Sequence, residues 1–291
     1  MTPHPIAPAP DIDMDHLRTW IGSDREKTDI ITVRMARMFN SIFDIDDPIG
    51  NGDEAPVGVH WCLAPDIATL GGSGVDGHPR RGGFLPPVPF PRRMWAGGEL
   101  TFFGKFHVGD DVVIRSIIDD VVLKTGRTGS LVFVTVRHEY RTSLGLMLSE
   151  RQDIVYREQE QGSSAPKPAN PDQNSRTADI SKVEETSPQL LFRYSAATFN
   201  SHRIHYDLAY ATQEELYPGL VVHGPLQATH LLRLAVERFD GSLPRIFSFR
   251  SMRPLISGQP FTANAATEID TEALWIAASD GNMTMMATAK K

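Results

Sequence analysis

The sequence predicts an α+β fold made of two similar halves. Helical residues precede a series of short strand-like runs, and this order occurs twice along the chain. Between the halves, residues 158–187 contain only Ile180 and Val183 as apolar residues larger than alanine, prolines aside. Such a stretch cannot bury enough surface to offset the entropy lost on ordering. We therefore expect a first domain over residues 1–157, a linker over 158–187 and a second domain over 188–291.

In the first half, residues 11–21 and 29–43 predict helices, the second because apolar side chains recur at spacings of three and four. Residues 71–91 are crowded with Gly and Pro, which neither helices nor strand ladders tolerate, so this segment should be irregular. Alternating side chains then predict an antiparallel meander from four runs, residues 99–106, 112–124, 131–143 and 146–158.

The second half predicts helical structure from Tyr194 to Phe239, interrupted near Asn200. Asp207 is expected to cap a short helix over residues 208–216. Gly224 followed by Pro225 predicts the start of a long buried helix, because proline is common at the first helical position. Turn residues separate four strand-like runs that follow, residues 245–254, 260–270, 273–280 and 283–290.

Composition excludes several classes of protein. The chain has 291 residues, of which 41% are hydrophobic and 22% charged, as expected of a globular protein rather than a fibrous or disordered one. Its net charge is -7 and it has no long basic run, so we expect no nucleic-acid partner. The sequence contains no run of 18 consecutive apolar residues, so it predicts no membrane-spanning helix. Its first ten residues lack the pattern of a secretory signal. Cys62 is the only cysteine, so no intrachain disulfide can form, which fits a reducing compartment. We therefore expect a cytoplasmic protein.

The richest candidate site combines a histidine cluster with a helix start. Asn200, His202 and His205 lie where the first helix should break, and an imidazole exchanges protons near neutral pH. The positive end of the helix at Gly224, with its free amides, could bind a polarised carbonyl oxygen. The alternatives are a hydrogen-bonded histidine with a structural role and a plain buried helix.

These residues resemble a known family. The run T-F-N-S-H-R-I-H-Y-D, followed by Y-P-G-L-V-V-H-G-P-L-Q, resembles the MaoC-like hydratases and dehydratases of the hot-dog fold. The resemblance implies a double hot-dog, in which two antiparallel sheets each wrap a central helix. In that family an acidic residue and a histidine five positions later act on water and an acyl-CoA thioester. The histidine corresponds to His205, and the V-H-G that opens the central helix corresponds to Val222, His223 and Gly224.

The acidic position of the family is occupied by Asn200, whose amide can orient water but cannot exchange protons as a carboxylate does. Asparagine there resembles the type 2 hydroxyacyl-thioester dehydratase branch. Segments of the first half, HWCLAPD, DGHP, FLPPVPFPRRMWAGGEL and ERQDIVYRE, are similar to the amino-terminal hot-dog domain of that branch. The similarity covers most of residues 14–157 and 187–291, with catalysis expected in the second domain only.

The resemblance implies a hydro-lyase that reversibly adds water to a 2-enoyl-CoA. His205 would activate the water, Asn200 would hold water or substrate, and the Gly224 amide would stabilise charge on the thioester oxygen. No metal and no cofactor beyond the CoA of the substrate is implied. Relatives that hydrate itaconyl-CoA or mesaconyl-C4-CoA point to a branched or five-carbon dicarboxylic acyl group and to itaconate degradation. Pairing of two chains as a homodimer is also implied.

Substrate binding needs cations for the CoA phosphates and for an acyl carboxylate. The arginines near the motifs are Arg80, Arg81, Arg92, Arg93 and Arg203, and His223 and Val222 belong to the expected substrate site. For the carboxylate, Arg250 and Arg253 are the candidates. The histidines of the first half have no matching partners and are expected to be structural: His60, His78, His107 and His138.

Three other functions fit the same residues. The first is a 3-hydroxyacyl-thioester dehydratase of fatty-acid metabolism. The second is a hot-dog acyl-CoA thioesterase, which would release a thiol instead of consuming the enoyl double bond. The third is a non-catalytic acyl-CoA-binding module, which Asn200 at the acidic position keeps open.

Overall fold

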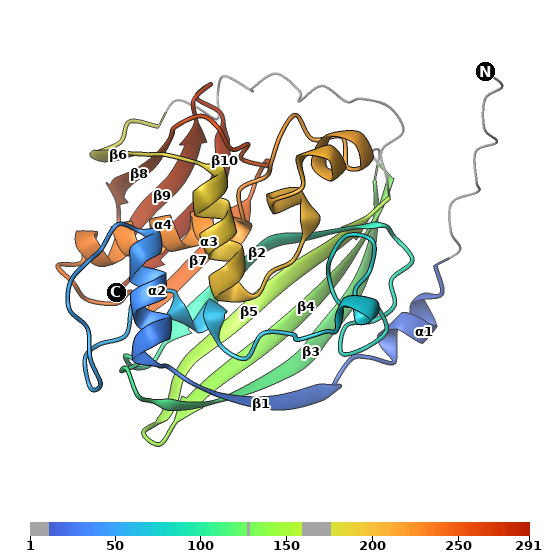
Figure 1. The fold of residues 1–291 in the computed structure, drawn as a ribbon, viewed down its shortest axis with the longest axis horizontal. Coiled ribbons are helices and arrows are strands. Elements are labelled where there is room, and N and C mark those ends of the chain that lie inside the picture. The colour runs from blue at the N-terminus through green and yellow to red at the C-terminus, as the bar shows by residue number, and fades with distance from the viewer. Residues whose placement is uncertain (1–11, 127–128, 159–175) are drawn as a thin grey trace.

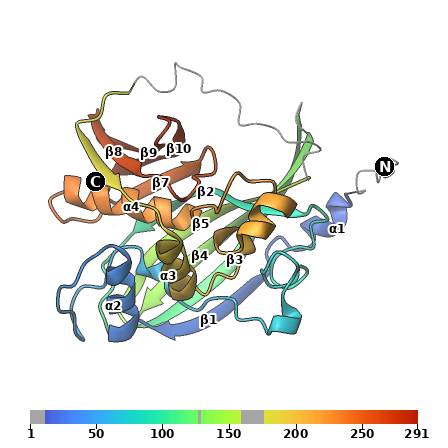
Figure 2. The same cartoon turned by 45° about the horizontal axis from the view of Figure 1, so that its top comes forward.

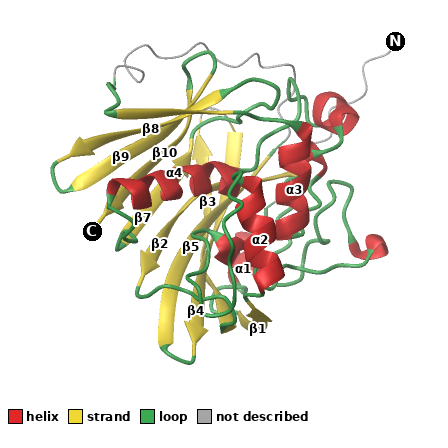
Figure 3. Cartoon of the chain, turned by 60° about the vertical axis from the view of Figure 1, so that its left-hand side comes forward, coloured by secondary structure: helices red, strands yellow, loops and turns green. Residues whose placement is uncertain are grey.

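A computed structural model describes residues 12–126, 129–158 and 176–291 (Figure 1). Its strands form one antiparallel sheet in the order β1-β3-β4-β5-β2-β7-β10-β9-β8-β6. The helices α2, α3 and α4 lie on one side of this sheet (Figure 3). The predicted α+β class is therefore confirmed, and the two predicted sheets are hydrogen-bonded into one.

Each half supplies five strands to the sheet. The first half contains α1 (Met14–Arg18), β1 (Asp24–Ile30), α2 (Val33–Ile42), η1 (Val59–Cys62), η2 (Leu70–Gly72), β2 (Arg92–Phe102), β3 (Asp111–Gly126), β4 (Gly129–Thr142) and β5 (Gly145–Arg157). The second half contains β6 (Ile180–Glu184), α3 (Pro188–Thr198), η4 (Arg203–His205), η5 (Tyr210–Glu214), α4 (Gly224–Arg238), β7 (Ile246–Ser251), β8 (Phe261–Glu268), β9 (Thr271–Ala278) and β10 (Met283–Lys290).

The halves join where β2 pairs with β7, with Gly97 opposite Arg250 and Gly98 opposite Phe249. A Cβ atom on Gly97 would lie 2.5 Å from the Phe249 carbonyl oxygen, and one on Gly98 would lie 2.3 Å from the Arg151 carbonyl oxygen. Only glycine allows this close approach, so the two glycines let β2 fit between β5 and β7.

Three predictions for the first half were wrong in detail. Strand β1 occupies the charged sequence DREKTDI at the sheet edge, where one face stays exposed and no apolar pattern marks a strand. The next helix therefore begins at Val33 rather than residue 29, after the Thr32 hydroxyl accepts a hydrogen bond from Met35 N at 3.1 Å. Strand β2 begins at Arg92 and lies beside β5, so only β3, β4 and β5 form a meander.

The predicted linker was too long at its carboxyl-terminal end. Ile180–Glu184 forms β6, which pairs with β8 through backbone hydrogen bonds, and backbone pairing of an edge strand needs little apolar surface. Residues 1–11 and 159–175, including the opening segment and most of the predicted linker, lie outside the described residues. Within the described ranges, no helix is both long and apolar enough to span a lipid bilayer.

Helix α4 begins at Gly224 with proline in its first turn, as predicted. It packs against β7, β8, β9 and β10 (Figure 2). Side chains on nearly its whole circumference are buried. The buried Gln227 side chain accepts a hydrogen bond from the Thr284 hydroxyl at 2.7 Å, which satisfies a polar group inside this core. The packing fixes the position of the amino end of the helix, beside which the predicted histidine cluster lies.

Candidate active site

His205 lies in a tight turn that follows α3. Phe199 ends α3 in the left-handed conformation with φ 50°, and the Asn200 side-chain oxygen then accepts a hydrogen bond from His202 N at 3.0 Å. The turn η4 comes next and contains His205, a residue that is only 6% exposed. Asp207 then caps the following turn, because its carboxylate accepts a hydrogen bond from Tyr210 N at 3.1 Å, as predicted.

The His205 ring is held in one tautomer. Its Nδ1 lies 2.7 Å from the carbonyl oxygen of Val221. A carbonyl oxygen only accepts, so Nδ1 carries the proton and Nε2 keeps a lone pair. Burial lowers the pKa of His205 to about 4, although the bond to Val221 opposes this shift. The imidazole is therefore neutral at pH 7 and its Nε2 is ready to accept a proton.

His223 supports His205 from one side. The two rings stack with centroids 3.6 Å apart, and His223 Nε2 lies 2.8 Å from the Ser195 hydroxyl. His223 is completely buried, and this burial, with His205 and His202 nearby, lowers its pKa well below the usual value. A neutral stacked ring fixes the plane of His205 without adding charge.

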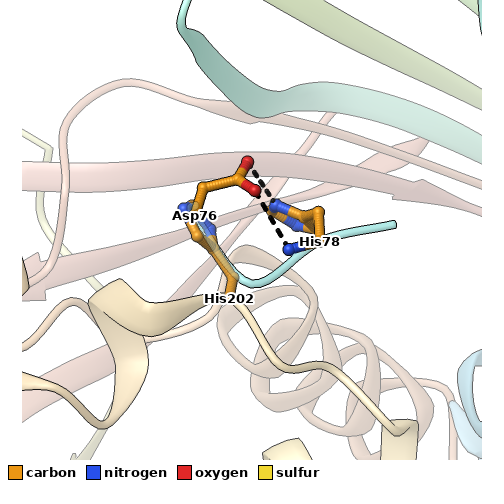
Figure 4. A group of neighbouring side chains, drawn as sticks. All are labelled: Asp76, His78 and His202. Atoms are coloured by element: carbon orange, nitrogen blue, oxygen red, sulfur yellow. Dashed lines mark hydrogen bonds and ion pairs between the residues drawn. The ribbon is translucent and has the colours of Figure 1, made fainter. Parts of the chain in front are cut away.

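The loop after η2 brings two further polar side chains, Asp76 and His78, next to His202 (Figure 4). The His78 ring lies 4.2 Å from the His202 ring, which lies 5.5 Å from the His205 ring. Asp76 Oδ2 is 3.0 Å from His78 Nδ1, and Asp76 Oδ1 accepts a hydrogen bond from His78 N. Sequence reasoning placed His78 among structural histidines because nothing local links it to a segment 120 residues away.

The loop is fixed to the segment that contains His205. Arg203 N donates to the Asp76 carbonyl oxygen at 2.9 Å, and Arg203 Nη1 donates to the Val75 carbonyl oxygen at 3.0 Å. The Ser201 hydroxyl donates to the Gly77 carbonyl oxygen. Gly77 in this loop has φ +90°, a conformation that favours glycine. The side chains of Asp76 and His78 are 17% and 20% exposed, so solvent reaches part of both.

An arginine-rich cavity of about 660 Å³ adjoins this loop. Its charged lining residues are Asp76, Arg80, Arg81, Arg92, Arg93, Arg203, Glu214 and Glu215. Arginines thus outnumber carboxylates, which favours an anionic ligand. Arg92 forms an ion pair with Glu215 at 3.1 Å, and Arg203 forms an ion pair with Asp207 at 2.8 Å. Both guanidinium groups are therefore held in place.

The structure brings together all five arginines that the sequence analysis selected near the motifs. It does not bring Arg250 and Arg253 to this cavity. Arg250 is exposed and alternates along β7 with the buried Phe249, so its side chain faces away from α4. Val222 is buried to 1% in the main core, and its amide donates to Leu255 O, so its side chain packs rather than facing the cavity.

The amino end of α4 completes the site. Its first N–H groups have no acceptor within the helix, and Gly224 lies next to the stacked histidine pair. A Cβ atom on Gly224 would lie 2.9 Å from Cε3 of Trp95, a residue of the first half. Both halves therefore shape the space around the helix start.

Within the described ranges, one group of side chains has donor atoms close enough together for a metal ion. Asp76, His78 and His202 each offer one such atom, all within 4.8 Å of one another. Two imidazoles and one carboxylate suit a first-row transition metal. The same atoms also suit proton exchange and water binding, because the Asp76–His78 hydrogen bond already orients one ring.

Sequence comparison places this chain among acyl-thioester enzymes. Residues 58–257 match the family model for hydroxyacyl-thioester dehydratase type 2. A mesaconyl-C(4)-CoA hydratase from Chloroflexus aurantiacus is 39% identical over 275 residues, covering 93% of this chain and 96% of the relative. The mitochondrial hydroxyacyl-thioester dehydratase type 2 of Schizosaccharomyces pombe is 28% identical, covering 65% of this chain and 69% of that protein.

Solved structures share the fold. A MaoC-like dehydratase from Phytophthora capsici aligns with TM-score 0.66 at 12% identity, covering 96% of this chain and 99% of the other. A Mycobacterium tuberculosis protein described as having a double hot-dog fold aligns with TM-score 0.52 at 13% identity, covering 92% of this chain and 95% of that protein. Together with the family match over 58–257, these similarities show that the chain belongs to the hydroxyacyl-thioester dehydratase type 2 family, with a double hot-dog fold.

Proposed function

We propose that this protein is a hydro-lyase that reversibly adds water to the double bond of a 2-enoyl-CoA. The observation that supports it best is the neutral His205, whose Nδ1–H is held by the Val221 carbonyl and whose Nε2 keeps its lone pair. The amino end of α4 follows His223, whose ring stacks on His205, and the arginine-rich cavity is lined by Arg203, two residues before His205.

In the hydration direction, His205 Nε2 takes one proton from water as the oxygen bonds to C3. The electron pair of the double bond moves toward C2 and the thioester oxygen. The Gly224 amide and the positive end of α4 stabilise the charge that develops on this oxygen. The imidazolium of His205 then gives its proton to C2, which restores the neutral ring and completes the 3-hydroxyacyl product.

The arginine-rich cavity suits the phosphates of CoA, since guanidinium groups bind phosphate oxygens in pairs. For the acyl group we propose a branched or five-carbon dicarboxylic acid, because a relative 39% identical over nearly the whole chain is a mesaconyl-C(4)-CoA hydratase. We also propose a homodimer, as the family resemblance implies. We propose a cytoplasmic location, since a chain with one cysteine can form no intrachain disulfide.

A panel of enoyl-CoA and 3-hydroxyacyl-CoA esters tests this proposal. We expect loss of enoyl absorbance with mesaconyl-C4-CoA, at a kcat/KM above that for crotonyl-CoA, and no release of free thiol. Thiol release without hydration would support a thioesterase. Tight binding of the esters without turnover would support a binding module.

The pH dependence of hydration should report the buried base. Neutral His205 is the active form, so activity is lost as pH falls through its pKa. Because burial lowers this pKa to about 4, kcat/KM should stay level from pH 7 to about pH 5 and fall below about pH 4. The rings facing His205 are His78, His202 and His223, and a positive charge on any of them would lower the pKa further. An acid limb near 6.5, the usual value for histidine, would contradict the assignment, and circular dichroism at each pH checks the fold.

Arg80 offers a mild test of CoA binding, because its exposed side chain lines the cavity. Arg80→Met should raise KM for CoA esters about two- to fivefold with little change in kcat, since a single exposed ionic contact contributes about 0.5–1 kcal/mol. Arg115→Met, which removes an exposed arginine paired with Asp24 on β1, is the matched control. Equal KM values for both variants would argue against phosphate binding at this cavity.

A further inference from the structure

A reacting water molecule in a buried site needs acceptors for both of its O–H groups, because an unpaired polar group costs free energy when removed from bulk solvent. His205 Nε2 can accept one. The side-chain oxygen of Asn200 already accepts the backbone N–H of His202 at 3.0 Å. One lone pair of this oxygen is left. If Asn200 uses it for the substrate, the second O–H group of the water needs another acceptor in the site.

His78 meets this requirement. The Asp76 carboxylate accepts a hydrogen bond from the backbone N–H of His78 through Oδ1, and its Oδ2 lies 3.0 Å from His78 Nδ1. An ionised carboxylate only accepts, so the proton of the His78 ring lies on Nδ1 and Nε2 keeps its lone pair. His78 and His205 are thus two imidazoles in the same tautomer, each fixed by an oxygen acceptor.

Position and access also favour His78. Its side chain is 20% exposed, whereas the whole His205 residue is only 6% exposed. Asp76 lines the arginine-rich cavity. The ring of its partner His78 lies 4.2 Å from the His202 ring, which lies 5.5 Å from the His205 ring. A thioester that enters from the cavity would therefore meet His78 next to the catalytic base.

We propose that His78, held in one tautomer by Asp76, binds the second O–H of the reacting water, so that each half of the chain contributes one imidazole to hydration. The inference rests on the proposed function. One water proton goes to His205 Nε2 and then to C2, as described above. The other proton stays on the oxygen, is accepted as a hydrogen bond by His78 Nε2, and becomes part of the 3-hydroxyl group of the product.

Asp76→Asn tests the tautomer directly. The backbone N–H of His78 should keep the amide oxygen at the Oδ1 position, which places the NH2 group against Nδ1. Nδ1 must then accept, so the ring proton moves to Nε2 and the lone pair for water is lost. We expect kcat to fall about 10²-fold while KM changes less than about threefold, as in other sites where a carboxylate fixes a histidine tautomer.

Two substitutions at His78 distinguish a water-binding role of this residue from a purely structural role. The side-chain amide of asparagine can replace Nδ1 as donor to Asp76 but offers nothing at Nε2, so His78→Asn should keep the melting temperature and lose about 10²-fold in kcat. The longer amide of glutamine can place an oxygen near the Nε2 position, so His78→Gln should recover part of this activity. His107→Asn, in the turn before β3, is the control and should keep wild-type kcat.

The outcomes are distinguishable. If wild-type protein hydrates enoyl-CoA while Asp76→Asn and His78→Asn are both fully active, the role of His78 is wrong and the proposed function stands. If wild-type protein hydrates no ester, the proposed function itself fails. Dialysis against EDTA should leave wild-type activity unchanged, and loss of activity that Zn²⁺ restores would overturn the water-binding role in favour of a metal site at Asp76, His78 and His202.

Discussion

His205→Asn should lower kcat for enoyl-CoA hydration by about 10²- to 10⁴-fold, the usual contribution of a general base. The asparagine side chain can still donate to the Val221 carbonyl, as Nδ1 does at 2.7 Å, so the local fold should survive. The change removes Nε2, the only part of the ring that the proposed proton transfer needs. Steady-state kinetics with the best substrate of the panel, together with thermal melting, measures both effects.

His107→Asn again provides a control for loss of an imidazole away from the site. KM should change little for His205→Asn, because the arginine-rich cavity proposed to bind CoA is untouched. A folded His205→Asn enzyme with wild-type kcat would exclude His205 as the base. Loss of activity accompanied by a much lower melting temperature would instead indicate a structural histidine, the alternative reading of this motif.

Gly77→Ala should damage both stability and activity. A Cβ atom at this position would lie 2.0 Å from the Ser201 carbonyl oxygen, which belongs to the backbone and cannot move aside alone. Gly77 also has φ +90°, where alanine is strained by about 1–3 kcal/mol. We expect unfolding free energy to fall by at least about 2 kcal/mol, or several degrees in Tm.

The same change should separate the loop of Asp76 and His78 from the segment that holds His205. We therefore expect kcat/KM to fall more than about tenfold, even at temperatures where the variant is folded. Gly82→Ala is a matched control, because Gly82 has a similar φ of +86° but its nearest Cβ contact would be Pro87 at 3.6 Å. If both variants lose the same unfolding free energy and the same kcat/KM, the effect of Gly77→Ala comes from backbone strain alone and the close approach of Gly77 to Ser201 has no further role.

Local sequence determined much of the second half. The start of α4 at Gly224 follows from the fixed φ of Pro225. Of the four last strands, β7, β8 and β10 lie within the predicted runs, and β9 begins two residues before its run. The break after α3 was also predictable, because Asn200 bonds its own neighbouring backbone. The charged edge strand β1 was missed because its side chains show no apolar alternation, and its pairing with β3 depends on the rest of the sheet.

The candidate site was predictable only in part. The sequence alone marked His205, the start of α4 and the five arginines near the motifs, since each belongs to a recognisable local pattern. Only the tertiary structure brought those arginines to one cavity and placed Asp76 and His78 beside His202. The reason is physical: pairing of β2 with β7 and the contact of Gly77 with Ser201 join residues more than 120 positions apart, and no local periodicity encodes such contacts.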